Sequence, residues 1–442
     1  MLERAADALW GPFTLCLLLG LGGVLMGRTG CFVLRRLPVL LRRGAGRGEH
    51  TADSPWVALS TALGATMGTG NIVGVATALT AGGPGALLWM QAAALAGMML
   101  KFSEVALAAD TRRLGPGPMG YLQLVFPGRY QKVLPGLFAV CCLLASVGMG
   151  NMTQSNAAAQ ALAPLSIPPF FCALFFGGFA YLATGRGVPG VMRLLTWLVP
   201  VMTVGYLLMG TAAVWQQRAV LPQTIQTVVA EAFRLRCAAA GAAGYTMRTA
   251  VRYGLSRGIF SNEAGMGSSP IAHAQAAGTD PVERGMWGVL EVLIDTSISC
   301  TMTALVILTA AGGQFWSSSG LDGAQLAAAS FAASLGAPSE AAVSVFVALF
   351  ALASVCGWFT YGAAALEFLL PGHPRIRQIY RLLYAVGTAW GALCEARGVW
   401  LLCDCFTGAM LLLNLPGLML LSGRVCAMVR RWDAGQRRYS RS

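Results

Sequence analysis

The chain has 442 residues, of which 56% are hydrophobic and only 11% are charged. Soluble globular proteins carry about 25% charged residues, so this composition excludes a soluble fold and indicates a polytopic membrane protein. The net charge of +13 does not indicate a nucleic-acid partner. The basic residues are almost all arginines in short loops between apolar segments, which is a signal for orientation in a membrane.

The sequence contains no pattern typical of an enzyme or of a metal cluster. Its twelve cysteines are scattered and its three histidines lie far apart, so neither a metal cluster nor a nucleophile beside a base is expected. Gly68-Thr69-Gly70 is not followed by lysine and is not a phosphate-binding loop. We therefore predict that the protein is not an enzyme and that it has no obligate protein partner.

Hydropathy predicts eleven membrane spans of about 20 residues, the length that a hydrocarbon core of roughly 30 Å requires. Arginines are concentrated in the loops after the first, third, fifth and ninth spans and in the C-terminal tail. Because basic loops stay in the cytoplasm, we expect the N-terminus outside and the C-terminus inside. An external stretch at 215–237 is predicted to hold a short amphipathic helix. The expected spans lie at about 10–34, 54–80, 85–110, 133–163, 167–184, 191–213, 240–272, 285–312, 340–370, 379–396 and 399–422.

Two of these spans contain glycine-rich, polar interruptions, at 64–74 and at 260–267. They lie within the second and the seventh span, five spans apart, so each of two five-helix halves begins with a broken helix, which is the plan of a transporter with two inverted repeats. The expected organisation is a peripheral first helix with its basic loop, two repeats of five helices, and a basic tail. These four segments are 1–50, 51–213, 214–423 and 424–442.

The first interruption has four glycines, two threonines and an asparagine within residues 64–74. A helix opened there exposes backbone amides that suit a carboxylate, and carbonyls from Gly64 to Met67 that suit a monovalent cation such as Na⁺. Backbone can open at membrane depth only where protein or a polar cavity satisfies it. The alternative is a glycine-rich packing face between helices.

Further polar groups lie in other spans. Residues 151–156 could line a cavity or join helices by hydrogen bonds. At the second interruption, Arg257 and Glu263 lie near the inner end of a span and must pair or reach water. The alternative is that this interruption is a cytoplasmic loop that ends the helix and leaves both residues exposed. In the ninth span Ser354 and Trp358 share one helix face and suit a cation ligand and a lid.

Intramembrane charges are expected to pair along their own helices. Lys101 and Glu104 are three residues apart, and Glu291 and Asp295 are four apart. The first two are predicted to form an ion pair. For the second two, a structural hydrogen-bonded pair is favoured over a proton relay.

These motifs together resemble the alanine/glycine:cation symporter family, over about residues 14–422. The block GLSRGIFSNEAGMGSSPIAH at 254–273 is the most specific part of the match. The other matching parts are GTGNIVGVATA at 68–78, GGPGA at 82–86, Gln154-Ser155-Asn156, Asp295-Thr296 and Cys300–Leu305.

The resemblance implies an all-α fold of eleven transmembrane helices, one peripheral and ten in a five-plus-five inverted repeat. It implies alternating-access import of alanine or glycine coupled to Na⁺, in the cell membrane. It also implies site residues. The substrate residues would be Thr69, Gly70, Asn71, Gln154, Phe260, Gly265 and Trp358, and the Na⁺ ligands would be Gly64, Met67 and Ser354.

The chain departs from the family pattern in the ninth span, where Ala353-Ser354 replaces two adjacent hydroxyl residues. This departure leaves proton-coupled transport or exchange open as the mode of the same site. A non-transporting amino-acid sensor on the same scaffold is a third possibility. Alanine and glycine are not separated, because one methyl group discriminates by only about 1–3 kcal/mol.

Overall fold

The computed structural model describes residues 4, 8–44, 54–126, 128–234, 247–275 and 280–439. These residues form helices joined by turns, and no strand occurs among them. Several helices begin at a capping side chain followed by proline. Ser54 caps the helix that starts at Pro55, and Asp280 caps the helix that starts at Pro281. Both caps satisfy backbone N–H groups that the first turn leaves free.

The helices of the N-terminal half are, in order, α2 (Pro12–Arg28), α3 (Phe32–Gly44), α4 (Pro55–Thr66), η1 (Thr69–Asn71), α5 (Val73–Gly82), α6 (Ala86–Asp110), α7 (Pro118–Tyr121), η2 (Leu122–Leu124), η3 (Gly128–Tyr130), α8 (Val133–Val147), η4 (Gly148–Met152), α9 (Thr153–Leu162), η5 (Ala163–Leu165), α10 (Pro169–Ala183), η6 (Thr184–Arg186) and α11 (Gly187–Gln216). Those of the C-terminal half are α12 (Leu221–Ala232), α13 (Met247–Asn262), α14 (Pro270–Gln275), α15 (Pro281–Val292), η7 (Leu293–Cys300), α16 (Thr301–Thr309), η8 (Ala310–Gly313), α17 (Phe315–Ser318), α18 (Gly323–Leu335), α19 (Pro338–Leu369), α20 (Pro374–Leu393) and α21 (Ala396–Tyr439).

Several helices are long and apolar enough to cross a membrane. Within the described residues there are six such stretches, or up to eight when each of two bent helix pairs is taken as one span. One of the six, Pro169–Gln216, contains both α10 and α11. Helices α13 and α20, which lie in the predicted seventh and tenth spans, are not among them. The chain is therefore a multi-pass helical membrane protein, and the number eleven stays a prediction.

Both predicted interruptions are present. The axes of α4 and of the helix that follows it differ by 63° at the first interruption. At the second, α13 ends at Asn262, and Glu263, Gly265 and Gly267 all have positive φ before α14 begins. Glycine adopts this conformation without steric cost, whereas Glu263 is strained there.

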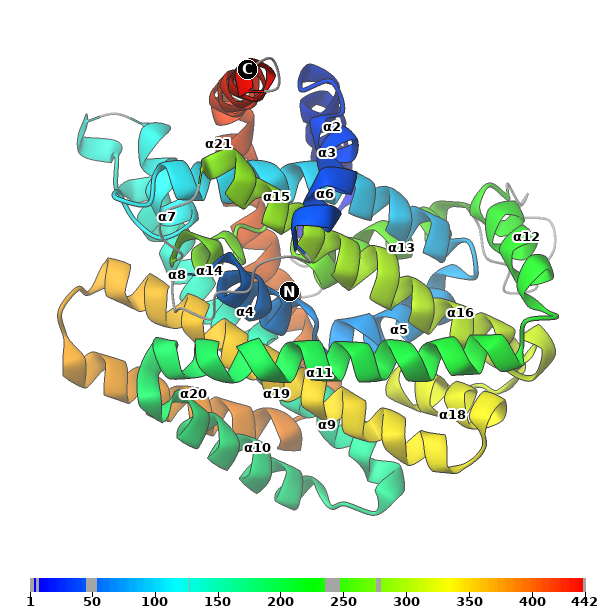
Figure 1. Cartoon of the computed structure of the whole chain (residues 1–442). Coiled ribbons are helices and arrows are strands. Elements are labelled where there is room, and N and C mark those ends of the chain that lie inside the picture. The colour runs from blue at the N-terminus through cyan, green and yellow to red at the C-terminus, as the bar shows by residue number, and fades with distance from the viewer. Residues whose placement is uncertain are drawn as a thin grey trace.

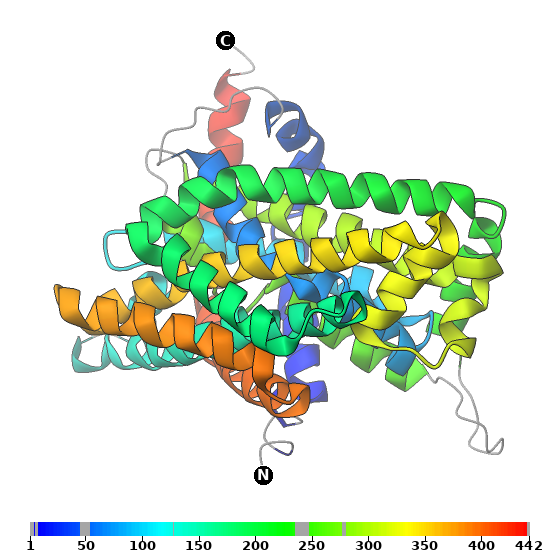
Figure 2. The same cartoon turned by 90° about the horizontal axis from the view of Figure 1, so that it is seen from below.

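The helices pack in two groups that meet at the interruptions. Helix α6 contacts α2, α13 and α15, while α19 contacts α4, α8, α9 and α11. Figures 1 and 2 show α10, α11, α19 and α20 lying together along one side of the molecule. Large apolar side chains such as Phe170, Trp197 and Leu383 remain exposed on α10, α11 and α20. Exposed apolar surface of this extent marks the faces that lipid covers.

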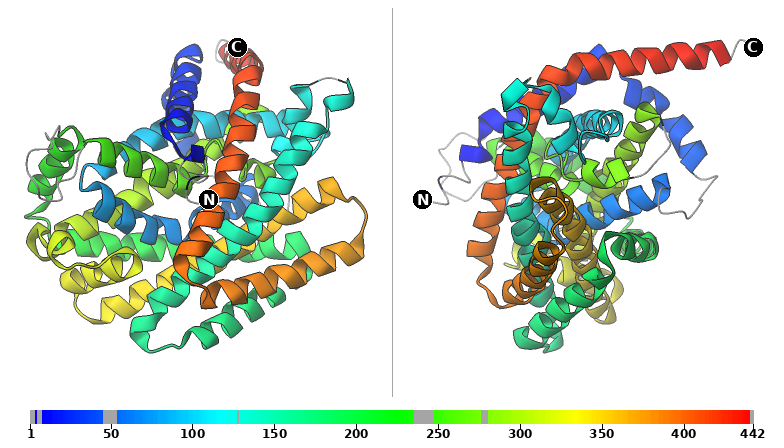
Figure 3. Two further views of the ribbon diagram at one scale, coloured as in Figure 1. Left: turned by 180° about the vertical axis from the view of Figure 1, so that it is seen from behind. Right: turned by 90° about the vertical axis from the view of Figure 1, so that its left-hand side faces the viewer.

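Figure 3 shows α2 and the C-terminal part of α21 projecting side by side from the rest of the molecule. Arg28 donates to the Ser422 hydroxyl at 3.0 Å, and Arg36 pairs with Asp433 at 2.7 Å. The helix predicted within 215–237 is confirmed as α12. Helices α3 and α18 were not predicted, because short helices between spans leave little trace in hydropathy.

Candidate functional site

The first interruption is a turn of buried backbone between α4 and α5. Thr69, Gly70 and Asn71 form a single 3-10 turn, and all three are buried. A side chain at Gly68 would place its Cβ 2.5 Å from the Ser354 Oγ and 2.8 Å from the Gln154 Oε1. Glycine is therefore required where three elements meet.

The turn redirects the hydrogen bonds that would continue α4. In a regular helix the Gly68 and Thr69 N–H groups would donate to the carbonyls of Gly64 and Ala65. Instead Gly68 donates to the Thr66 carbonyl at 2.8 Å, and Thr69 donates to the Gln154 Oε1 at 3.0 Å. The carbonyls of Gly64 and Ala65 are thus released from the helix.

The released carbonyls face the Ser354 hydroxyl of α19. Its Oγ lies 3.2 Å from the Gly64 carbonyl and 3.1 Å from the Ala65 carbonyl. One hydroxyl has a single hydrogen and can donate to only one of them. Three buried oxygens therefore converge with one proton between them, which is the donor set that a hard cation takes.

Met67 is the remaining predicted cation ligand. The Asn71 N–H donates to the Gly68 carbonyl rather than to Met67, so the Met67 carbonyl is also released from helical bonding. Its thioether contacts the Thr203 hydroxyl at 3.4 Å.

Gln154 and Phe260 meet the turn from two sides. The Gln154 Oε1 accepts from both the N–H and the hydroxyl of Thr69, each at 3.0 Å. A Cβ built on Gly70 would lie 3.7 Å from the Phe260 ring. The Thr69 N–H thus already binds an oxygen acceptor, the same kind of atom that a substrate carboxylate would present.

Asn71 is held by Asp295, a residue absent from the predicted site. The Asn71 Nδ2 donates to the Asp295 Oδ1 at 2.7 Å and to its backbone carbonyl at 3.0 Å. The Asp295 Oδ2 accepts from the hydroxyls of Ser261 and Thr296, both at 2.7 Å. Asp295 therefore bridges the two interruptions. The Asn71 Oδ1 is buried without a hydrogen-bond partner in the described structure.

The predicted hydrogen-bonded pair of Glu291 and Asp295 is wrong. Residues 293–300 form a π-helix, which changes the angular register that a spacing of four residues implies in an α-helix. Asp295 turns to the first interruption, whereas the Glu291 carboxylate bonds His273 at 3.1 Å and Lys101 at 3.2 Å.

The predicted ion pair of Lys101 with Glu104 is also wrong. The Lys101 ammonium lies 2.5 Å from the Ser269 hydroxyl and pairs with Glu291. Glu104 instead accepts from the Asn414 amide at 2.5 Å. All of these side chains are buried between helices. Each charge therefore bonds a group on a neighbouring helix and not the opposite charge three residues away on its own helix.

Trp358 and Gly265 lie at the second interruption. The Trp358 Nε1 donates to the Glu263 Oε1 at 3.0 Å, and its side chain packs on Gly150, where a Cβ would clash. Glu263 is buried and also bonded by Ser268, which excludes the alternative of an exposed loop for this residue. The Gly265 carbonyl accepts from Asn414 at 2.8 Å, and a Cβ on Gly265 would meet Leu411.

The amides of residues 151–156 serve two purposes. Asn151 donates to the Tyr384 carbonyl at 2.6 Å, and Asn156 donates to the Gly391 carbonyl at 2.9 Å, so both join helices. Gln154 alone of the three reaches Thr69. The π-helix η4 lies directly before it, and sequence composition does not reveal such a change of register.

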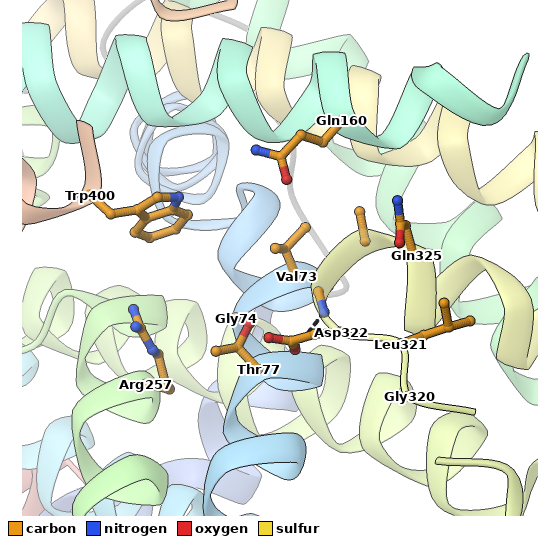
Figure 4. Close-up of a pocket in the computed structure, with 12 residues that line it drawn as sticks. Val73, Gly74, Thr77, Gln160, Arg257, Gly320, Leu321, Asp322, Gln325 and Trp400 are labelled. Carbon is orange, nitrogen blue, oxygen red and sulfur yellow. Dashed lines mark hydrogen bonds between the residues drawn. The ribbon is translucent and has the colours of Figure 1, made fainter. Parts of the chain in front are cut away.

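A cavity of about 490 Å³ opens beside the first interruption (Figure 4). Val73 and Thr77 of α5, Arg257 of α13 and Trp400 of α21 line it. Asp322, at the start of α18, lines it from another side.

A helical, multi-pass chain with two interrupted helices that meet at buried polar backbone has an architecture typical of membrane transporters. Known structures share this fold. A manganese transporter from Eremococcus coleocola aligns with a TM-score of 0.55 and 16% identity, over 83% of this chain and 77% of that one. A nucleobase-cation-symport-1 family transporter aligns with a TM-score of 0.51 and 12% identity, over 79% and 74%. These similarities concern the fold.

The chain belongs to the sodium:alanine symporter family, whose model matches residues 1–441. It is 35% identical to the sodium/alanine symporter AgcS of Methanococcus maripaludis, over 96% of this chain and 95% of that protein. It is 31% identical to the probable sodium/glutamine symporter GlnT of Bacillus subtilis, over 95% and 87%. It is also 31% identical to the putative sodium/proton-dependent alanine carrier protein YrbD of Bacillus subtilis, over 94% and 88%. The protein is therefore a transporter and not an enzyme.

Proposed function

We propose that the protein imports alanine, glycine or both with Na⁺ as the coupling ion, by alternating access. The observation that carries the proposal is the pair of carbonyls, Gly64 and Ala65, that leave the helix and face the Ser354 hydroxyl. Oxygen ligands at an unwound helix suit Na⁺, and the amides beyond them suit a carboxylate. One interruption then binds both solutes side by side.

In this proposal the N–H groups of Thr69 and Gly70 hold the substrate carboxylate. The Gln154 Oε1, which accepts from Thr69, moves aside when the carboxylate arrives. Asn71 offers its unpartnered Oδ1 to the substrate ammonium. Phe260, Gly265 and Trp358 complete the pocket, and Na⁺ binds to Gly64, Met67 and Ser354, with the Ala65 carbonyl as an added ligand.

The architecture that goes with this function is the five-plus-five inverted repeat. We propose eleven transmembrane helices, with segments 1–50, 51–213, 214–423 and 424–442 as the peripheral helix with its loop, the two repeats and the tail. The protein would lie in the cell membrane with its N-terminus outside and its C-terminus in the cytoplasm. The two interruptions at the first helices of the proposed repeats support this plan.

Proton coupling of the same site is the second candidate. Ala353 stands beside Ser354, where a further hydroxyl could otherwise serve as a cation ligand. One relative is named a putative sodium/proton-dependent alanine carrier.

Uptake into liposomes separates the candidates. Purified protein is reconstituted, and uptake of labelled alanine and glycine is measured under an inward gradient of Na⁺, Li⁺ or H⁺. We expect accumulation only with the Na⁺ gradient, because Na⁺ binding creates the substrate site. Uptake that does not depend on Na⁺ and is driven by external acid would overturn Na⁺ coupling in favour of the second candidate.

A further inference from the structure

The cavity beside the first interruption is a second polar chamber, distinct from the buried turn at Thr69 and Gly70. It has a volume of about 490 Å³ and is lined by residues from five separate elements. Phe260 contacts both places, because its ring would lie 3.7 Å from a Cβ on Gly70 and its centre is 5.7 Å from the Arg257 guanidinium carbon. A solute in the cavity is therefore one aromatic side chain away from the turn.

Arg257 is held in this cavity by aromatic rings. Its guanidinium carbon lies 5.7 Å from the centre of the Phe260 ring and 5.5 Å from that of Trp400, and the two ring centres are 5.5 Å apart. Within the described parts of the chain no carboxylate pairs with Arg257. A guanidinium has five N–H donors, and stacking leaves them free to bind an acceptor in the cavity.

Asp322 brings the opposite charge from another element. Its Oδ1 accepts from the Thr80 hydroxyl at 2.8 Å and from the Gly323 N–H at 2.6 Å, which fixes the carboxylate at the start of α18. Figure 4 shows Arg257 and Asp322 on different elements around the cavity. The amide side chains of Gln160 and Gln325 also line it. A fixed cation and a fixed anion in one chamber suit a dipolar ligand.

We propose that this cavity is a second binding site for a free amino acid in its zwitterionic form. The α-carboxylate binds Arg257 and the α-ammonium faces Asp322. The inference rests on the proposed function, since it takes the transported solute to be an amino acid. Because the cavity is much larger than alanine, waters share it and the side chain of the ligand is weakly selected. Phe260, which contacts both Arg257 and the turn, is the side chain that links this site to the site at the turn.

Equilibrium binding measures the number of sites directly. Labelled alanine is titrated to millimolar concentrations against protein in lipid nanodiscs with saturating Na⁺, so both faces are accessible. We expect two alanine molecules per protein. The Arg257→Gln variant should bind one, with the remaining affinity unchanged, and Arg257→Lys should keep two sites with the second about tenfold weaker. Arg248→Gln, which removes an exposed arginine of the same helix outside the cavity, should bind two.

A single alanine per wild-type protein, with uptake intact, would overturn the second site and leave the proposed function standing. Two alanine molecules in the Arg257→Gln variant would overturn it as well. Absence of both binding and uptake in the wild type would overturn the two proposals together. If Arg257→Gln does not fold, Asp322→Asn carries the test, because asparagine preserves the helix cap while removing the charge. It should weaken the second site about tenfold, and two sites of unchanged affinity would contradict the proposal.

Discussion

At the scale of single residues, Asn71 is a side chain of the candidate site that is only partly satisfied by the protein. Its amide nitrogen makes two hydrogen bonds to Asp295, while its carbonyl oxygen is buried without a partner. A buried polar atom left unpaired costs about 1–3 kcal/mol, and this cost at an interrupted helix supports our proposal that the substrate ammonium binds there. The role of Asn71 was inferred from sequence, but Asp295 as its holder was not, because a contact over 224 positions has no local signature.

Replacement of Asn71 tests whether this side chain binds the substrate. We expect Asn71→Ala to reduce alanine uptake to near background in the liposome assay while the protein still inserts and elutes as a folded species. The control is Asn156→Ala, which removes a buried amide that joins α9 to α20 at a cost of about 0.6 kcal/mol per bond. Normal uptake by Asn71→Ala would move the substrate site elsewhere.

At the scale of elements, the interruptions could be predicted because glycine and polar residues at membrane depth are visible in composition. Their hydrogen-bond exchange could not, since it depends on Gln154 and Ser354 from two other helices. The π-helices η4 and η7 were also missed, and η7 made the expected pairing of Glu291 with Asp295 wrong. A shift of hydrogen-bond register leaves no mark on hydropathy.

Gly68 tests whether the close approach of these three elements matters. A Cβ there would lie 2.5 Å from the Ser354 Oγ and 2.8 Å from the Gln154 Oε1. We expect Gly68→Ala to lower the rate of uptake about tenfold or more, because sites tolerate displacements of only about 0.5 Å. Gly136→Ala in α8, where nothing lies within 4 Å, should transport normally. Unchanged uptake by Gly68→Ala would mean that α4 and α19 need not meet here.

At the scale of the whole molecule, buried charges join the helix packing. Lys101 of α6 contacts Ser269, next to α14, and Glu291 of α15, which also bonds His273. The sequence showed that these charges lie in apolar segments. It did not show which would meet, because that depends on how α6, α14 and α15 pack.

The Lys101 cluster makes a prediction about stability. Removing one partner of a buried ion pair leaves an uncompensated charge, so Lys101→Met should lower the free energy of unfolding by about 3–5 kcal/mol. Adding Glu291→Gln should restore most of it, and thermal unfolding in detergent measures both. The exposed pair of Arg424 with Asp110 is the control, since Arg424→Gln should cost no more than about 1 kcal/mol. Equal losses in the single and double variants would show that the charge is not the cause.

We propose that one interruption binds the cation and the amino acid together, so that each strengthens the binding of the other. The most direct measurement is the Kd for alanine in nanodiscs with Na⁺ or with choline, and the Kd for Na⁺ with and without alanine. We predict that both ratios agree, in the range of about 5- to 150-fold typical of coupled sites. Ser354→Ala should bring the ratio close to one, whereas Ser344→Ala, a hydroxyl that bonds only within α19, should leave it unchanged. Equal alanine affinity in Na⁺ and choline for the wild type would contradict coupled binding at this interruption.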